Sequence, residues 1–460
     1  MKTFTKIGAA VAALLGTSSA FALNLADTNA APVQLVVAGA SAARDSFLYL
    51  LAVEIADPAS LTIYQSSNAN FRAVSGTLKT GTTSDPVGSV GRVLADRGIA
   101  GQNFTVYYRA EGGSIWGPGS IVAKQLNPAF TGIKAVDTTL PAWAGVTAVT
   151  PTPSYFGVAI PTFNATIAYN IDADSDSSGF LSDKQTQYGV SDVEPAMFTS
   201  TNWLPNTNTK FPAYSAAIGS ALTALPKTAL FGQTFGFIVS NQGPAAGLTN
   251  LSKQQLTSIF TSGGFVNWNK IPGLASGAIF KARREPGSGT QASAAAYLAG
   301  VNTGRSSYTF VVDNGNTIRE FTSTGALNNY VGSQGATIPP AGQSAIGLAV
   351  VANPAPTGTH FVNIDGVAPD RLNVQNGTYD FAFELTTQIA SGTAGNSLAL
   401  AQSIDILGAR AASVPDLISV FAIPSATNVP GSSVPGTVGG NRPVANGTRS
   451  GNSALPFKAQ

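Results

Sequence analysis

The sequence predicts an α/β protein, because three strand–turn–helix units follow one another along the chain. In the first, an apolar run at residues 33–38 ends in a small-residue turn, and residues 43–56 then carry apolar side chains at helical spacing. The other two units span residues 103–126 and 277–301. Strands that alternate with helices form parallel sheets, so we expect the three turns to gather at the carboxyl ends of the strands, where such folds bind ligands.

Four further segments complete the predicted organisation. Residues 251–261 have the apolar spacing of a helix, residues 344–351 are typical of a buried strand, and residues 396–422 are mostly helical in pattern. From residue 424 onward the chain is rich in Pro, Gly, Ser and Asn and poor in apolar residues, so we expect a flexible tail.

The N-terminus has the pattern of an export signal. Lys2 and Lys6 give a basic start, residues 7–16 are apolar, and Ala20–Ala22 form an A-x-A cleavage site. We therefore expect a signal peptide at residues 1–22, cleaved after Ala22, and a periplasmic or secreted protein. No later segment approaches the roughly 18 uninterrupted apolar residues that a membrane helix needs, so we expect no membrane span in the mature chain.

Composition narrows the classes of function. The chain has 460 residues, which suggests two or three units of about 100–200 residues each. Without the two signal lysines, 23 basic residues balance 23 acidic ones, so the sequence gives no reason to expect nucleic acid as a partner. There is no cysteine, and the single histidine, His360, argues against a Ser-His-Asp hydrolase and a multi-histidine metal site. We expect His360 to be structural and predict no cofactor.

Hydroxyl side chains stand at the predicted helix starts, where they could help to bind an anion. A helix N-terminus exposes unpaired N–H groups and carries partial positive charge, and glycine lets a ligand approach the backbone closely. Arg284 would add a charge-assisted donor for a tetrahedral oxyanion. The hydroxyl candidates are Ser41, Ser114, Ser288 and Thr290. Each could equally be an ordinary N-cap, because Ser and Thr are preferred there.

Seven stretches match, in chain order, motifs of one known family. They are VAGASAA (37–43), YYRAEGGS (107–114), YGVSDVEP (188–195), GLTNLSKQQLTSIFTSGGFVNWNKI (247–271), RREPGSGT (283–290), SAIGLAVV (344–351) and IDGVAPDRLNVQNGTYDF (364–381). Together they resemble the PstS-type phosphate-binding periplasmic solute receptors. The helix–tryptophan stretch at 247–271 and the closing stretch at 364–381 are the most specific, because helix capping does not require them.

The resemblance implies a two-lobed periplasmic binding protein fold of type II, in which each lobe is a mostly parallel sheet flanked by helices and the ligand lies in the interlobe cleft. Lobe 1 would comprise residues 23–240 and 345–423, with a large insert at about 115–190. Lobe 2 would comprise residues 241–344. The implied function is that of an exported monomer that binds inorganic phosphate, for uptake through an ABC transporter or for scavenging, and is not an enzyme.

The resemblance also implies which residues bind the anion. Ser41 matches the first-turn hydroxyl, and Asp192 matches an acceptor carboxylate. Ser114 matches a second hydroxyl, although its turn can be aligned one residue to either side. The second-lobe group would be Arg284, Ser288, Gly289 and Thr290.

Asp192 has the most specific predicted role. A carboxylate beside an anion repels it unless the anion carries a proton to donate. Monohydrogen and dihydrogen phosphate carry one, whereas sulfate near neutral pH does not, so an ionised Asp192 would select phosphate. The alternative from the residues alone is an exposed acidic turn residue in SDVEP.

The sequence departs from the family pattern at several places. About 75 residues separate Ser114 from Asp192, far more than the family's usual short helix. Pro286 replaces an acid of the second-lobe turn, with Glu285 one position earlier, and Leu348 replaces a usual aromatic residue. Arg44 is an additional charge near the first turn, either solvated or reaching the site.

An acidic stretch within the insert resembles a calcium loop in its spacing of acids. Its candidate ligands are Asp172, Asp174, Asp176 and Asp183. Ser177 replaces the turn glycine, Asp183 replaces the usual glutamate, and the flanks are not helical, so a solvated acidic loop is the favoured interpretation and no metal is predicted. Two other functions stay open: a secreted phosphatase-like enzyme, and a surface interaction protein on the same scaffold.

Overall fold

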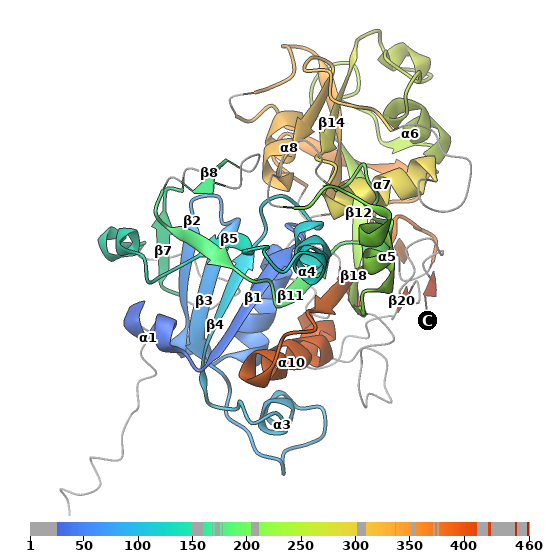
Figure 1. The fold of residues 1–460 in the computed structure, drawn as a ribbon. Helices are drawn as coiled ribbons and strands as arrows, with labels where there is room; N and C mark the ends of the chain where they lie inside the picture. The colour runs from blue at the N-terminus through green and yellow to red at the C-terminus, as the bar shows by residue number, and fades with distance from the viewer. Residues whose placement is uncertain are drawn as a thin grey trace, which may run out of the picture.

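The protein is described by a computed structural model that covers residues 25–149, 160–167, 169–170, 175–176, 178–203, 211–300, 310–335, 337–351, 355–370, 373–374, 377–411, 422–424, 447–448 and 458–459. The predicted signal peptide and most of the predicted tail lie outside these residues. The chain forms two lobes, one containing β1 to β4 and the other containing β14 and α6 to α8 (Figure 1).

One sheet runs through both lobes. Within the described residues its strands lie in the order β15 (Ile318–Phe321), β14 (Ile279–Arg284), β16 (Ser344–Val350), β12 (Thr228–Ser240), β18 (Ala382–Ile389), β11 (Tyr188–Ser191), β1 (Val33–Gly39), β4 (Asn103–Arg109), β3 (Phe71–Thr77), β2 (Thr62–Ser66), β7 (Thr162–Ala165) and β6 (Ala148–Val149). Three more strands pair beside this path: β13 (Asn250–Leu251), β17 (Thr359–Ile364) and β19 (Ala422–Pro424).

Each strand that carries a predicted ligand turn has at least one parallel neighbour. In lobe 1, β1 is parallel to both β4 and β11, and in lobe 2, β14 is parallel to both β15 and β16. Antiparallel ladders occur elsewhere, notably between β11 and β18 and between β12 and its partners. The predicted α/β class with two lobes is confirmed.

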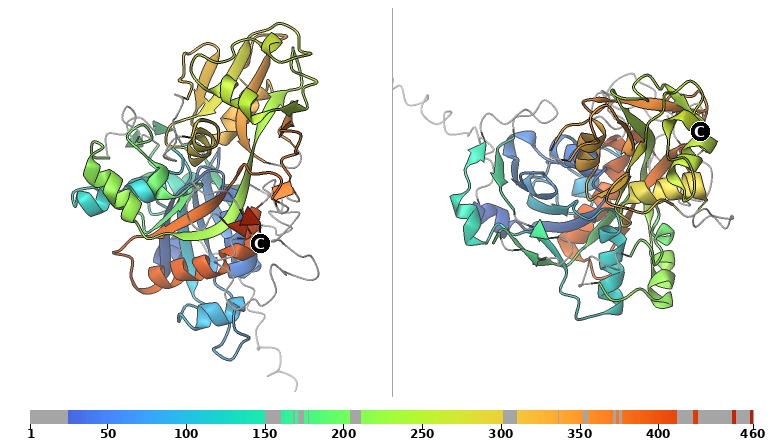
Figure 2. Two further views of the ribbon diagram at one scale, coloured as in Figure 1. Left: turned by 90° about the vertical axis from the view of Figure 1, so that its right-hand side faces the viewer. Right: turned by 90° about the horizontal axis from the view of Figure 1, so that it is seen from above.

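The strand β12 passes from one lobe into the other (Figure 2). Its first half pairs with β18, and its second half, from Phe235 onward, pairs with β16 and β17. The predicted division had placed β16 and β17 in lobe 1, whereas their partners are β14 and the second half of β12. We therefore propose that lobe 2 begins within β12 and includes both strands.

Helices cover the sheet on both faces. They are α1 (Leu25–Ala30), α2 (Arg44–Tyr49), α3 (Val90–Ala95), α4 (Trp116–Leu126), α5 (Ala216–Ala224), α6 (Lys253–Phe260), α7 (Gly289–Ala299), α8 (Thr324–Val331) and α10 (Gly395–Ala411). Along β1, Leu35 and Val37 belong to the apolar cluster that includes Leu400 of α10, whereas Ala38 belongs to the cluster that includes Trp116 of α4. The strand is therefore buried on both faces, as its almost continuous apolar sequence indicates.

The three predicted strand–turn–helix units are confirmed as β1–α2, β4–α4 and β14–α7. The first helix is shorter than predicted, because α2 ends at Tyr49 and a π-helical turn, Leu50–Ile55, continues it. The last helix, α10, ends at Ala411, and residues 412–421 lie outside the described residues. Within the predicted insert, β7 and β6 extend the sheet beyond β2, while β5 (Ile133–Val136) pairs separately with β10 (Leu181–Lys184).

Trp268, from the helix–tryptophan stretch, and His360, which was expected to be structural, both make contacts within the fold. Trp268 is fully buried, and its indole N–H donates to the Ser344 carbonyl at 3.3 Å. His360 lies on β17, where its ring nitrogens contact the Asn241 side chain at 2.6 Å and the Leu248 carbonyl at 2.7 Å. Among the helices of the described part of the chain, none is sufficiently long and apolar to cross a bilayer.

Gly39, the last residue of β1, allows β1 and β11 to approach closely just before Ser41 and Asp192. Its φ is +134°, and a Cβ at this position would lie 1.8 Å from the Val190 carbonyl oxygen. We expect Gly39→Ala to lower the free energy of unfolding by about 3 kcal/mol or more, because strain and overlap add. Urea unfolding measures this. Gly145→Ala is the control, since a Cβ there meets nothing within 4 Å, and equal losses in the two variants would contradict the prediction.

Candidate functional site

Four turns from the two lobes meet at one place. The turns after β1, β4 and β11 carry Ser41, Ser114 and Asp192, and these three strands are parallel neighbours whose carboxyl ends lie at one edge of lobe 1. The fourth turn follows β14 and comes from lobe 2. We call the residues that meet here the interlobe cluster: Ser41, Ser114, Asp192, Arg284, Ser288, Gly289 and Thr290. These are the seven residues that the sequence predicted as ligands.

Asp192 lies at the centre of the interlobe cluster and is 1% exposed. Its Oδ2 accepts hydrogen bonds from the Ser114 hydroxyl at 3.1 Å and from the Thr290 hydroxyl at 3.4 Å. Its Oδ1 is buried and has no hydrogen-bond partner among the described residues. One carboxylate thus contacts both lobes and keeps an acceptor oxygen for a further donor.

Burial raises the pKa of Asp192 to about 6, although the Ser114 hydrogen bond and the positive charge of Arg284 act in the opposite direction. The ionised form is disfavoured because desolvation removes more stabilisation than these neighbours return. Near neutral pH the side chain is therefore an ionised acceptor, and below about pH 6 it becomes a protonated donor.

Arg284 is 1% exposed and uses its donors mainly within lobe 2. The Nε and Nη2 groups donate to the Phe321 carbonyl at 3.1 Å, the Thr322 carbonyl at 3.1 Å and the Glu285 carboxylate at 3.0 Å. Nη1 donates to the Thr324 hydroxyl at 2.8 Å and contacts Ser41 Oγ at 3.5 Å. A guanidinium has five N–H donors, so the long contact to Ser41 is the one that an anion could most readily replace.

Glycine positions let the turns of the two lobes touch. A Cβ on Gly289 would lie 2.5 Å from Ser114 Oγ and 2.7 Å from Asp192 Cβ, so a side chain here would displace the carboxylate. The Ile115 amide also donates to the Gly287 carbonyl at 2.9 Å. The second-lobe turn is therefore held directly against the turn that carries Ser114.

The start of α7 points at the same place. Ser288 is its N-cap, and its hydroxyl accepts from the Gln291 amide at 3.5 Å. Gly289 and Thr290 are the first two helical residues, so their N–H groups have no partner within the helix. Ser288 thus has the ordinary capping role that was its alternative interpretation. The helix it caps directs its N-terminal N–H groups and partial positive charge toward the interlobe cluster, where the Thr290 backbone N–H donates to the Asp192 carboxylate.

A side chain of β4 holds the turn that follows β1 and carries Ser41. The Tyr108 hydroxyl donates to the Ala40 carbonyl at 2.6 Å, which holds the backbone just before Ser41. Arg44, the additional charge noted in the sequence, donates from Nη1 to the Asn68 carbonyl at 3.1 Å and to Asn70 Oδ1 at 3.0 Å. It therefore links α2 to the turn between β2 and β3.

Two acidic residues near Arg284 were not predicted as part of the site. Burial raises the pKa of Glu285 to about 8 even though the Arg284 charge opposes the shift. Burial likewise raises the pKa of Glu111, against a hydrogen bond from Asn70 and the charges of Arg109, Arg284 and Arg44. Both residues lie in or next to predicted ligand turns, and this position in the sequence could have indicated that they belong near the site. Thr324, whose hydroxyl faces Arg284, gave no such signal because it is 40 residues away.

The acidic stretch of the insert does not assemble a metal site in the part that can be examined. Asp172 and Asp174 lie outside the described residues, and the side chain of Asp176 is not described. Asp183 does not lie in a loop: it belongs to β10, where it contacts Lys134 of β5 at 3.2 Å and accepts from the Thr131 hydroxyl at 2.8 Å. Among the described residues no group of three or more His, Cys, Asp or Glu side chains could hold a metal ion.

Comparison with known proteins gave structural matches alone. No protein-family model and no curated protein sequence matches the chain. A phosphate ABC transporter substrate-binding protein from Clostridium perfringens, solved with bound phosphate, is 12% identical, with coverage of 84% of this chain and 99% of that one and a TM-score of 0.43.

Two further solved structures are similar. A phosphate-binding protein from Stenotrophomonas maltophilia is 12% identical over 84% of this chain and 86% of its own, with a TM-score of 0.39. An ABC-type phosphate transport receptor from Vibrio cholerae is 16% identical over 46% and 70%, with a TM-score of 0.30. These proteins are of the class that the sequence motifs resemble. None of these three TM-scores reaches 0.5.

The buried carboxylate should destabilise the ligand-free protein at neutral pH. The pKa of Asp192 is about 6 in the folded protein, against an ordinary value of 3.8, so ionising the side chain in the folded state costs about 3 kcal/mol. We expect Asp192→Asn to raise the free energy of unfolding at pH 7 by about 1–3 kcal/mol. The gain should shrink as the pH falls through 6 toward 4, because the native carboxyl then binds its proton.

Urea unfolding at pH 7 and pH 5, in buffer free of phosphate and sulfate, tests this stability effect. Asp365→Asn is the control, because this exposed residue at φ +50° caps the Lys253 amide at 3.1 Å and an asparagine can do the same. A gain that does not change with pH would contradict the assigned cause.

Proposed function

We propose that this chain is an exported solute-binding protein that binds inorganic phosphate between its two lobes. The observation that carries the proposal is the interlobe cluster: donors from both lobes surround one buried carboxylate that retains an unpartnered oxygen. Export, a monomeric state and delivery to an ABC transporter or scavenging outside the cell belong to the same proposal and rest on the sequence motifs.

The cluster supplies the donors that a tetrahedral oxyanion requires. The donors are the Ser41 hydroxyl, the backbone N–H groups at the start of α7 and one charged donor, Arg284 Nη1. The hydroxyls of Ser114 and Thr290 donate to Asp192 in this structure and would join these donors by rotating toward the anion. Several directed donors in a buried place bind an anion more strongly than they would at the surface, because water does not compete.

The acceptor in the cluster selects among oxyanions. Asp192 Oδ1 has no described partner, so an anion that brings a proton can donate to it. Phosphate near neutral pH can do this, whereas sulfate would place two negatively charged oxygens together without a proton between them. The arrangement therefore favours a protonated tetrahedral anion over its unprotonated isostere.

Replacing the acceptor by an amide should reverse the preference. In Asp192→Asn we expect phosphate affinity to fall at least tenfold, about 1.4 kcal/mol, and sulfate affinity to rise, because the amide N–H₂ donates where the carboxylate accepted. Isothermal titration calorimetry with both anions at pH 7, on protein refolded free of carried-over ligand, measures this, with Asp365→Asn as the control. If the wild type releases no heat with phosphate, the proposed function is wrong.

The same preference should depend on pH in the wild type. Because the pKa of Asp192 is raised to about 6, the side chain is an acceptor at pH 8 and an acid that can donate at pH 5. We expect the ratio of phosphate affinity to sulfate affinity to be at least about tenfold lower at pH 5 than at pH 8. In Asp192→Asn this ratio should change less with pH, which separates the effect of Asp192 from the titration of Glu285 and Glu111. An equal decrease of the ratio in both proteins would contradict the role of Asp192.

A further inference from the structure

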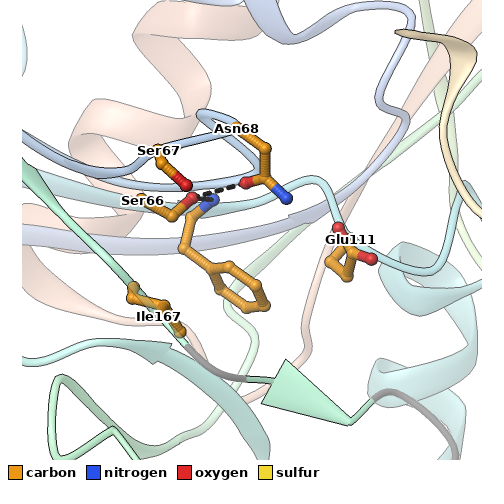
Figure 3. A pocket seen from close by; sticks show the side chains of 6 residues that line it. Ser66, Ser67, Asn68, Glu111 and Ile167 are labelled. Carbon is orange, nitrogen blue, oxygen red and sulfur yellow. Dashed lines mark hydrogen bonds between the residues drawn. The ribbon is translucent and has the colours of Figure 1, made fainter. Parts of the chain in front are cut away.

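A polar cavity lies in lobe 1 (Figure 3). Its volume is about 90 Å³, which corresponds to roughly three water molecules. It opens between the β2–β3 turn, Glu111 after β4, and Ile167 of the insert. The lining residues are Ser66, Ser67, Asn68, Phe71, Glu111 and Ile167.

Three connections place this cavity next to the proposed phosphate site. Glu111 and Ser114 belong to the same turn, three residues apart. The charge of Arg284 acts on the Glu111 carboxyl. From the other side, Arg44 lies three residues after Ser41 and donates to Asn70, and the Asn70 amide donates in turn to Glu111 Oε2.

The burial of the cluster residues indicates the direction in which a substituent on a bound phosphate could extend. Ser114, Asp192 and Thr290 are at most 1% exposed, so a substituent cannot extend in their direction. Ser41 and Glu111, in contrast, are only partly buried, and Ser67 at the rim of the cavity is exposed. A group attached to a bound phosphate would therefore extend past Ser41 toward Glu111.

The lining defines the chemistry of such a group. Ser67 and Asn68 provide polar groups, and Asn70 occupies one oxygen of Glu111, which leaves Oε1 to accept from a ligand. The charges of Arg44, Arg109 and Arg284 already act on the Glu111 carboxylate, so a neutral hydroxyl can donate to it without a further cation.

The apolar part of the lining fits a short carbon chain. Phe71 and Ile167 form this part, so methylene groups can pack there while hydroxyls face the polar side. We propose that the cavity is a subsite for the hydroxylated substituent of a small phosphate monoester whose phosphate group occupies the interlobe cluster. This inference rests on the proposed function, because it requires the phosphate group to bind there.

Calorimetry of the mature chain with inorganic phosphate and with glycerol 3-phosphate tests the subsite. We expect the ester to bind within about tenfold of phosphate, since its monoanion keeps one proton to donate to Asp192 and exchanges one phosphate oxygen contact for contacts in the cavity. In Ser67→Leu the longer side chain fills the cavity, so ester affinity should fall at least about tenfold, while phosphate affinity stays within about twofold. Ser67 lies outside the interlobe cluster. Ser262→Leu, at an exposed turn of lobe 2, is the matched control.

Each outcome bears on a distinct claim. Selective loss of the ester in Ser67→Leu supports the subsite. If the wild type binds phosphate but not glycerol 3-phosphate, the subsite is refuted and the phosphate-binding function stands. If Ser67→Leu weakens phosphate and ester equally, the cavity does not distinguish them and the subsite is also refuted. If neither compound binds, the proposed function fails and the subsite with it.

Discussion

The contact between Asp192 and the hydroxyls of Ser114 and Thr290 is the interaction on which the rest of the site depends. It joins a residue of β11's turn to one from each of two other turns, and it buries a carboxylate that retains an unpartnered oxygen. A buried, incompletely paired charge destabilises the fold, so it persists only because the surrounding elements are fixed by their own packing. The parallel strands β11, β1 and β4, and α7 from lobe 2, supply that packing.

Charge balance around Arg284 shapes what the site can accept. Its guanidinium is committed to lobe 2 carbonyls, Thr324 and Glu285, and it reaches Ser41 through its longest contact. If Arg284 were to give the anion more than one charge-assisted hydrogen bond, some of these bonds would need to break. Under the proposed function, the donors that remain for the anion are mostly hydroxyl and backbone groups, which are directional and therefore sensitive to ligand shape and protonation.

Several features were predictable from the sequence because they depend on local chemistry. Apolar runs followed by Gly- and Ser-containing turns predicted β1–α2, β4–α4 and β14–α7, and the motif resemblance placed Asp192 among the ligands although it is 78 residues from Ser114. Other contacts were not predictable. Thr324 accepts a hydrogen bond from Arg284, and the charge of Arg284 acts on Glu111. Both interactions depend on how β14, β15 and β4 are arranged, and no local sequence pattern specifies which distant residue lies across a sheet.

The sequence by itself determined the α/β class, the positions of the ligand turns and the types of side chain they carry, because strand and helix periodicity and turn residues act over a few neighbours. The tertiary structure alone decided that β16 pairs with β14 and that β17 pairs with the second half of β12. It also decided that Arg284 uses most of its donors on residues 285–324 and that one oxygen of Asp192 is buried without a described partner. These outcomes depend on desolvation and on contacts between residues far apart in the chain, which only the packed fold brings together.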